Sequence, residues 1–126
     1  MHAINNVTHL EPIGDMYGKA FEHFIAQELR AWLSYNNRRE RLSFWRTKHQ
    51  QEVDFIIGDH IALEVKTAHR KSNRDHKGLM ALSEEQRWER MNIISFDKQR
   101  ARYENGIEHM HWEEFLDDLW NGRILN

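Results

Sequence analysis

The chain has 126 residues, of which 40% are hydrophobic and 30% are charged, and its 18 Lys/Arg and 20 Asp/Glu residues give a net charge of −2. This length suits a single domain over residues 1–126, with residues 1–15 as an N-terminal extension. The absence of cysteine excludes disulfides and thiolate metal sites, and the lack of both a secretory leader and an apolar run of about 18 residues leads us to expect a cytoplasmic protein that does not enter a membrane.

The first half of the chain predicts one helix and three strands. A helix is expected over residues 16–33 with Asp15 as its N-cap, because apolar residues recur there with the i, i+3, i+4, i+7 spacing of a buried face. These apolar residues are Tyr17, Phe21, Phe24, Ile25, Leu29 and Trp32. Strands are expected over residues 42–47, 52–57 and 61–66, and Gly58-Asp59 predicts a tight turn between the second and third. The short connections favour antiparallel pairing.

The second half predicts a helix, two strands and a closing helix. The first of these helices is expected to begin near Asp75 or Lys77, and Ser83 followed by Glu84-Glu85-Gln86 resembles a capping box that would start another helical turn, running to about Arg90. Strands are expected over 91–96 and 107–112 with a loop between them, and a helix over 112–122. A helix between the third and fourth strands predicts a right-handed parallel crossover. The expected fold class is therefore α/β, with a mixed sheet flanked by helices.

The predicted hairpin "QEVDFIIGDHIALEVK" carries charges among its apolar residues. Side-chain alternation places Asp54 with Ile56 on one face of its strand, and Glu64 with Lys66 on one face of the next. The tight turn brings Asp54 close to Glu64 or Lys66. One interpretation is a solvent-exposed face with a surface ion pair that contributes roughly 0–1 kcal/mol. The other is a cleft in which two carboxylates bind Mg²⁺ or Mn²⁺.

The hairpin also resembles a known nuclease core. Asp54, nine further residues and then Glu64-Val65-Lys66 are similar to the D…ExK motif of the PD-(D/E)XK nuclease superfamily, and the expected order of elements matches its restriction-endonuclease-like αβββαβ core. The segments "YGKAFEHFIAQEL", "FWRTKHQQEVDFII", "ALEVKT" and "EEFLDDLW" resemble the uncharacterised C-terminal nuclease-like domain of bacterial and archaeal AAA-type ATPases, over about residues 18–120.

The chain departs from the family pattern in two respects. Val53 replaces the Pro of the motif. No Walker A pattern occurs, so the chain is a stand-alone relative or a fragment, and an ATPase is an implied partner.

The resemblance implies an endonuclease that uses Mg²⁺ or Mn²⁺ to hydrolyse DNA phosphodiester bonds. Asp54 and Glu64 would bind the metal, and the carbonyl oxygen of Val65 would be a further ligand. Glu22 would add another carboxylate, and Lys66 would position the attacking water and stabilise the transition state. Nucleases of this kind often cut both strands as dimers, which makes a homodimer plausible. The alternative is a catalytically inactive module on the same fold that binds DNA or another protein.

Basic residues give a second set of candidates. Runs of Lys and Arg over residues 38–48 and 66–77 would contact phosphates, although each run alone is equally consistent with a solvated face. The predicted nucleic-acid contacts are Lys48, His69, Arg70, Lys71, Arg74 and Lys77. For His109 and His111 we favour a structural role over metal chelation, and for Trp45 and Trp88 core packing over base stacking.

Overall fold

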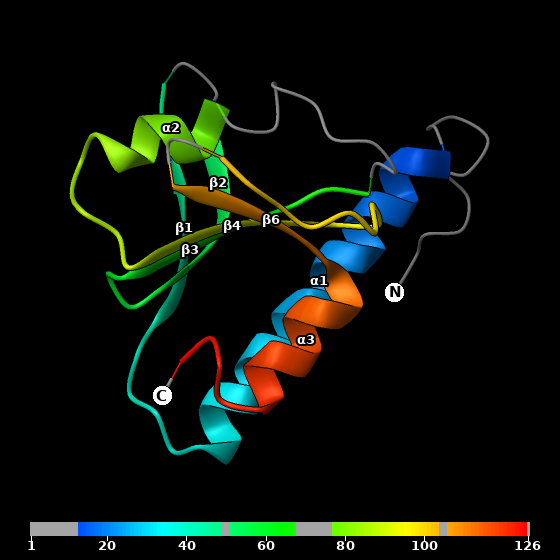
Figure 1. Ribbon diagram of the computed structural model, residues 1–126, viewed down its shortest axis with the longest axis vertical. Helices are drawn as coiled ribbons and strands as arrows, with labels where there is room; N and C mark the ends of the chain where they lie inside the picture. The colour runs from blue at the N-terminus through cyan, green and yellow to red at the C-terminus, as the bar shows by residue number, and fades with distance from the viewer. Residues whose placement is uncertain (1–12, 49–50, 68–76, 104–105, 126) are drawn as a thin grey trace.

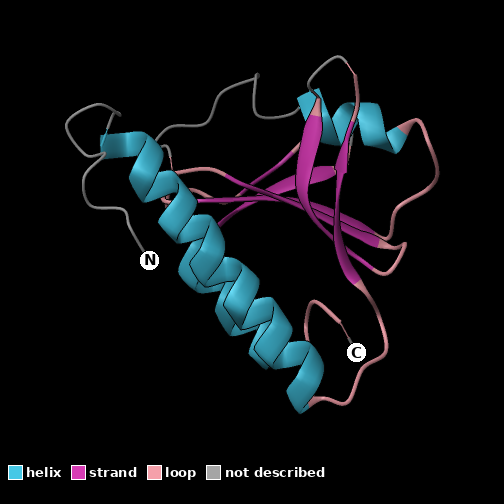
Figure 2. Cartoon of the chain, turned by 180° about the vertical axis from the view of Figure 1, so that it is seen from behind, coloured by secondary structure: helices cyan, strands magenta, loops and turns pink. Residues whose placement is uncertain are grey.

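A mixed sheet of six strands lies between helices on both of its faces in the computed structural model, which describes residues 13–48, 51–67, 77–103 and 106–125 (Figures 1 and 2). In chain order the elements are α1 (Ile13–Tyr35), β1 (Leu42–Arg46), β2 (Glu52–Ile57), β3 (Ile61–Val65), α2 (Lys77–Ser83), β4 (Arg90–Ser95), β5 (Ala101–Arg102), β6 (Ile107–His111) and α3 (Trp112–Trp120). The order across the sheet is β1-β2-β3-β4-β6-β5. The predicted α/β class is confirmed.

Strand pairing follows the expected pattern over most of the sheet. β1, β2 and β3 are antiparallel neighbours. β4 then pairs parallel with β3, as a crossover through α2 requires, and β6 pairs parallel with β4. The β2–β3 turn closes with the His60 amide donating to the Ile57 carbonyl, and Gly58 has φ +62°, a conformation that L side chains rarely adopt. The tight turn predicted at Gly58-Asp59 is therefore confirmed.

Each face of the sheet has its own apolar core. α1 and α3 lie side by side on one face, and α2 lies on the other (Figures 1 and 2). The larger core joins α1 and α3 to the sheet through residues that include Phe21, Ile25, Leu29, Phe55, Ile57, Leu63, Ile94, Met110, Phe115 and Leu119. The smaller core lies beneath α2 and comprises Val53, Ile56, Ala62, Leu79, Leu82, Met91, Ile93 and Ile107. Among the described helices none has the length and apolarity needed to cross a membrane.

The predicted helix boundaries are wrong at two places. α1 already includes Ile13, so Asp15 lies within the helix and is not its N-cap. α2 ends at Ser83, where the amides of Glu84 and Glu85 donate to carbonyls three residues back and so form turns instead of a further helix. Ser83 directs its hydroxyl back to the Met80 carbonyl, 2.6 Å away, rather than capping a new helical turn. The capping-box interpretation is therefore incorrect.

A short strand occupies part of the predicted loop between the last two strands. β5 pairs antiparallel with β6, and ion pairs to the Glu108 side chain hold it in place. Arg100 Nε lies 2.8 Å and Arg102 Nη2 3.6 Å from the Glu108 carboxylate oxygens. The side-chain pattern of two residues is too short to be recognised as a strand.

Candidate functional site

The candidate site lies where β2 and β3 separate. Their backbone pairing ends at Phe55 and Leu63, and the next opposed residues are Asp54 and Glu64. There the Asp54 amide donates to Glu64 Oε1 at 3.2 Å. The Val65 amide donates to Asp54 Oδ2 at 2.8 Å. Side-chain bonds thus replace the backbone ladder and hold the two carboxyl groups between the strands. The predicted proximity of Asp54 to Glu64 is confirmed.

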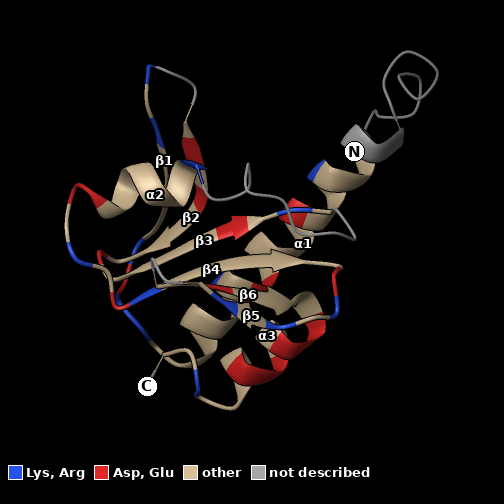
Figure 3. Cartoon of the chain, turned by 45° about the horizontal axis from the view of Figure 1, so that its top comes forward, with Lys and Arg blue, Asp and Glu red and all other residues tan. Residues whose placement is uncertain are grey.

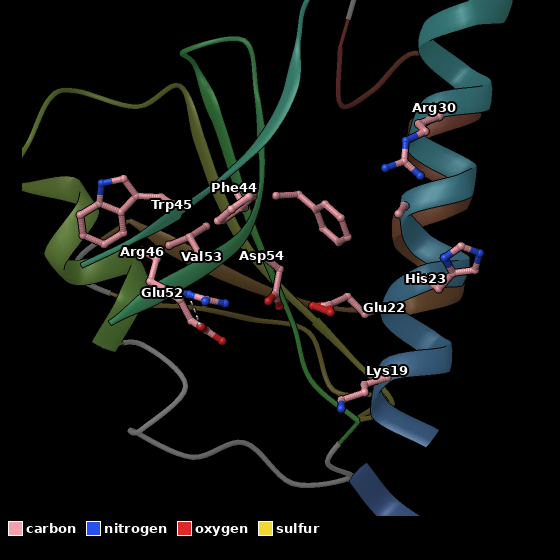
Figure 4. Close-up of a pocket in the computed structure, with 12 residues that line it drawn as sticks. Lys19, Glu22, His23, Arg30, Phe44, Trp45, Arg46, Glu52, Val53 and Asp54 are labelled. Carbon is pink, nitrogen blue, oxygen red and sulfur yellow. Dashed lines mark ion pairs between the residues drawn. The ribbon is translucent and has the colours of Figure 1, made fainter. Parts of the chain in front are cut away.

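A β-bulge determines which way Asp54 points. One residue of β1, Phe44, lies opposite two residues of β2, Asp54 and Phe55. As a result Val53 and Phe55, two positions apart, belong to the cores on opposite faces of the sheet. Simple alternation would place Asp54 on the face of Ile56, beneath α2. The bulge instead turns the Asp54 carboxyl toward α1 (Figure 4), so that part of the sequence interpretation is wrong.

The first helix and the end of β3 complete the cluster. The carboxyl groups of Glu22 on α1 and Asp54 on β2 face one another and share a hydrogen bond (Figure 4). Lys66 follows β3, and its Nζ lies 3.7 Å from Glu64 Oε2. The Glu64 side chain is only 5% exposed, whereas that of Lys66 is 37% exposed. All four of the predicted catalytic side chains therefore come together at one place.

Burial and mutual contact shift the acids of this cluster toward their protonated forms. Burial, the hydrogen bond with Glu64 and repulsion from it raise the pKa of Asp54 to about 7. Burial, followed by the hydrogen bond with Asp54 and its repulsion, raises the pKa of Glu22 to about 7. Burial also raises the pKa of Glu64, although the hydrogen bond with Asp54 and the charge of Lys66 oppose this. Near neutral pH the cluster therefore retains protons that exposed carboxylates would have lost.

The donor set matches a hard divalent cation in its chemistry but does not form a coordination shell as it stands. Carboxylate and carbonyl oxygens are the ligands that Mg²⁺ and Mn²⁺ prefer. Within residues 13–48, 51–67, 77–103 and 106–125, however, no three His, Asp or Glu side chains are grouped so as to hold a metal ion. The reason is visible in the contacts: Glu22 bonds to Asp54, and Asp54 and Glu64 bond to each other's strands. Protons and a cation would compete for the same oxygens. Binding of a metal ion would therefore require the carboxyl groups of Glu22, Asp54 and Glu64 to lose protons and to rotate.

A pocket of about 590 Å³ gives access to the cluster between α1 and the β1–β2 hairpin (Figure 4). Its lining includes Glu22 and Asp54 together with Arg46, from the basic run over residues 38–48, and two cationic residues that sequence reasoning missed, namely Lys19 and Arg30. Lys19, Glu22, Ala26 and Arg30 recur at intervals of three and four, which is the spacing of one helix face. That pattern could have identified this helix face, though not the pocket, from the sequence.

The predicted phosphate contacts are described only in part. Lys48 is exposed just beyond β1, and Lys77 is exposed at the start of α2. His69, Arg70, Lys71 and Arg74 lie outside the described residues. Among those that are described, Figure 3 shows Lys and Arg on β1 and several Asp and Glu residues on α3. α3 therefore carries acidic side chains, of which Asp118 forms ion pairs with Arg100 and Arg123.

The remaining candidates have structural roles, as favoured from the sequence. His109 is buried, with Nε2 at 2.6 Å from Ser95 Oγ and Nδ1 at 2.9 Å from the Gln99 carbonyl. His111 is the N-cap of α3, where its Nδ1 accepts the Glu113 amide. Trp45 and Trp88 are partly buried against the core beneath α2.

Comparison with known proteins identifies a family but no relative of known activity. Residues 17–115 match the family described as "Domain of unknown function (DUF4143)". No curated protein and no solved structure matches the chain. The matched segment covers most of the chain and includes every residue of the carboxylate cluster. The chain therefore belongs to the DUF4143 family.

Proposed function

We propose that this domain is a metal-dependent nuclease that hydrolyses DNA phosphodiester bonds. One observation carries the proposal: Asp54, Glu64 and Lys66 meet where β2 and β3 separate, and Asp54 lies on the lining of a pocket. The carboxyl groups of Asp54 and Glu64 are in contact with each other, and the pKa values of both are raised. Such a pair is typical of a functional site, because a purely structural ion pair would place a carboxylate beside a cation.

Each residue has a role that follows from its position. Asp54 and Glu64 would hold the cation, with the Val65 carbonyl and Glu22 as additional oxygen donors. The bound cation would supply a Lewis acid for the phosphate and a water of lowered pKa. Lys66 keeps its ammonium group beside Glu64, where it can orient a water molecule and stabilise charge developing on the phosphate oxygens.

The cationic pocket wall favours a polyanionic substrate. Arg30 on α1 and Arg46 on β1 are both exposed on the lining of the pocket that contains Asp54. They would attract a phosphate backbone and offset the repulsion between that backbone and the carboxylates. A neutral or cationic substrate would gain nothing from these groups.

The proposal is tested by metal binding and cleavage measured on the same preparations. We expect Mn²⁺ to raise the unfolding temperature, because a cation that binds only the folded state stabilises it. Glu64→Gln should remove this effect, whereas Glu85→Gln, which changes an exposed side chain in the turn after α2, should not. Mn²⁺ should also support cleavage of supercoiled plasmid and of circular single-stranded DNA by the wild type. A chain that is neither stabilised nor activated by Mn²⁺ would contradict the proposal.

A non-catalytic DNA-binding or protein-interaction module is the second candidate. The observation that favours it is the inward bonding of the carboxyl groups, since Asp54 Oδ2 accepts the Val65 amide and Glu64 Oε1 accepts the Asp54 amide. In this case the carboxyl groups would have only a structural role, which is to hold β2 and β3 at the point where their backbone pairing ends. DNA binding without cleavage, unaffected by Lys66→Ala, would support this candidate.

A further inference from the structure

Phe44 is an exposed aromatic residue on the wall of the pocket that leads to the carboxylates. It lies in β1, the edge strand of the sheet, and it is 68% exposed. A single exposed apolar side chain is ordinary on a protein surface. Phe44 differs because it lines the same pocket as Glu22 and Asp54, opposite the lining residues of α1 (Figure 4). The bulge that turns Asp54 toward α1 also lies directly across from Phe44.

Two arginine side chains share the pocket lining with the Phe44 ring. The Arg46 guanidinium lies 5.8 Å from the ring centroid, and its Nε is 3.2 Å from Glu52 Oε2. Arg30 lines the facing wall, on α1. Cationic side chains beside an exposed aromatic ring are an arrangement that binds single-stranded nucleic acid, since the cations hold the backbone and the ring stacks on a base.

The size of the pocket argues against a base-paired substrate. A volume of about 590 Å³ is in the range of roughly 300–1,000 Å³ that is typical of small-ligand pockets. Such a space admits one or two nucleotides but not a duplex. Glu64 is 4% exposed, and Asp54, which lines the pocket, is half-buried, so a scissile phosphate must enter the pocket to reach Asp54. An unpaired strand can bend into the pocket, whereas a stacked duplex cannot do so without distortion.

We infer that the substrate is single-stranded DNA, or an unpaired DNA end, and that Phe44 stacks on the base next to the scissile phosphate. This inference rests on the proposed function, because it assigns the pocket to the substrate of the carboxylate cluster. Phe44 acts as a positioning residue: base stacking on its ring fixes the strand, and the phosphate that follows then lies above Glu22 and Asp54.

The test compares the binding of a fluorescent 20-nucleotide oligo(dT) strand and a 20-base-pair duplex, at low salt in EDTA, by fluorescence anisotropy. The variants are Phe44→Ala, Phe44→Trp and, as a matched control, Tyr35→Ala, which removes an 80% exposed aromatic side chain at the far end of α1. Because Phe44 is exposed, its replacement should leave the unfolding temperature nearly unchanged.

The wild type should bind the single strand at least tenfold more tightly than the duplex. Phe44→Ala should weaken single-strand binding about 5- to 150-fold, the range that corresponds to the loss of one base–aromatic stack. Phe44→Trp should retain it and Tyr35→Ala should not alter it. Equal affinity for strand and duplex, no binding of the strand, or unchanged binding by Phe44→Ala would each overturn the inference.

Mn²⁺-dependent cleavage by the same proteins separates this inference from the proposed function. If the wild type cleaves DNA and Phe44→Ala binds the strand normally, the inference fails and the nuclease proposal stands. If Phe44→Ala loses strand binding and the wild type does not cleave, single-strand binding stands and the nuclease proposal fails. Absence of both binding and cleavage would overturn both.

Discussion

Asp54 and Glu64 are opposed residues of neighbouring strands, and each accepts a backbone amide from the other residue's strand. The Asp54 amide donates to Glu64 Oε1 at 3.2 Å, and the Val65 amide donates to Asp54 Oδ2 at 2.8 Å. Side-chain oxygens thus take the acceptor positions that backbone carbonyls occupy in the rest of the sheet. The two carboxyl groups are fixed by the fold, and their proximity destabilises the ionised state of the cluster.

Asp54→Asn should stabilise the protein without metal and remove its activity. The Asn side-chain oxygen can still accept the hydrogen bond from the Val65 amide. The free-energy cost of burying an ionised carboxylate, however, is removed. At pH 8 in EDTA we expect a gain on the order of 2 kcal/mol in the free energy of unfolding, measured by urea denaturation. A variant less stable than the wild type under these conditions would contradict the assigned cost of ionising Asp54.

The stability of the metal-free protein should fall as the pH rises from about 5 to about 8. The folded-state pKa of Asp54 is about 7, above the value of about 3.9 for an unfolded Asp, so between these values the folded state binds more protons. Unfolding then releases protons, and stability decreases with pH until the folded-state carboxyl has ionised. Glu22 acts in the same direction, because its pKa is also raised to about 7.

The pH effect is isolated by comparing the wild type with Asp54→Asn in EDTA at each pH. The advantage of the variant in unfolding free energy should be small at pH 5 and large at pH 8. A difference that is the same at both pH values would show that Asp54 does not titrate between them in the folded protein.

Gly78→Ala should destabilise the fold through the contact between α2 and β2. A Cβ at Gly78 would lie 2.0 Å from the Glu52 carbonyl oxygen, so the helix would have to move away from the strand that carries Asp54. Forced displacements of this kind cost about 1–3 kcal/mol, measurable by urea denaturation.

Gly18→Ala is the matched control for Gly78→Ala. A Cβ at Gly18, in α1, would make an ordinary contact at 3.7 Å with the Thr67 side chain. This substitution should stabilise the protein by about 0.5–1 kcal/mol, because Ala favours the helix more than Gly does. Equal effects of the two substitutions would contradict close packing at Gly78.

Arg30→Gln should weaken DNA binding and reduce its dependence on salt. Arg30 lines the pocket, whereas the exposed Arg39 follows α1 and is not among the residues that line it. Loss of one phosphate contact lowers the slope of log affinity against log salt by about 0.7–1. Anisotropy titrations at several salt concentrations should show this for Arg30→Gln and not for Arg39→Gln. Identical slopes for the two variants would exclude Arg30 from the binding surface.

Much of the fold was predictable, because its signals are local. The spacing of Phe21, Ile25 and Leu29 defined the first helix, and Gly58-Asp59 defined the hairpin turn that brings Asp54 to Glu64. The limits of the elements were less predictable, since helix ends depend on tertiary contacts as well as on sequence.

The orientation of Asp54 was not predictable from the strand pattern. It depends on the bulge opposite Phe44. The alternation of side chains along a strand does not indicate where a strand contains one extra residue. The pocket depends on the packing of α1 against the β1–β2 hairpin, so the position of Phe44 and Arg46 on its lining is evident only once these elements are placed. The spacing of Lys19, Glu22 and Arg30 could be recognised in the sequence as one face of a helix. The strands that lie opposite this face could not.

The most direct measurement is the rate of Mn²⁺-dependent DNA cleavage by the wild type and by Lys66→Ala. Lys66 is 37% exposed, so its truncation should leave the fold intact while removing the ammonium group beside Glu64. We expect cleavage by the wild type, a loss of roughly 100-fold or more in the variant, and an unchanged rise in unfolding temperature with Mn²⁺. Failure of the wild type to cleave, or equal rates for the two proteins, would contradict the central claim.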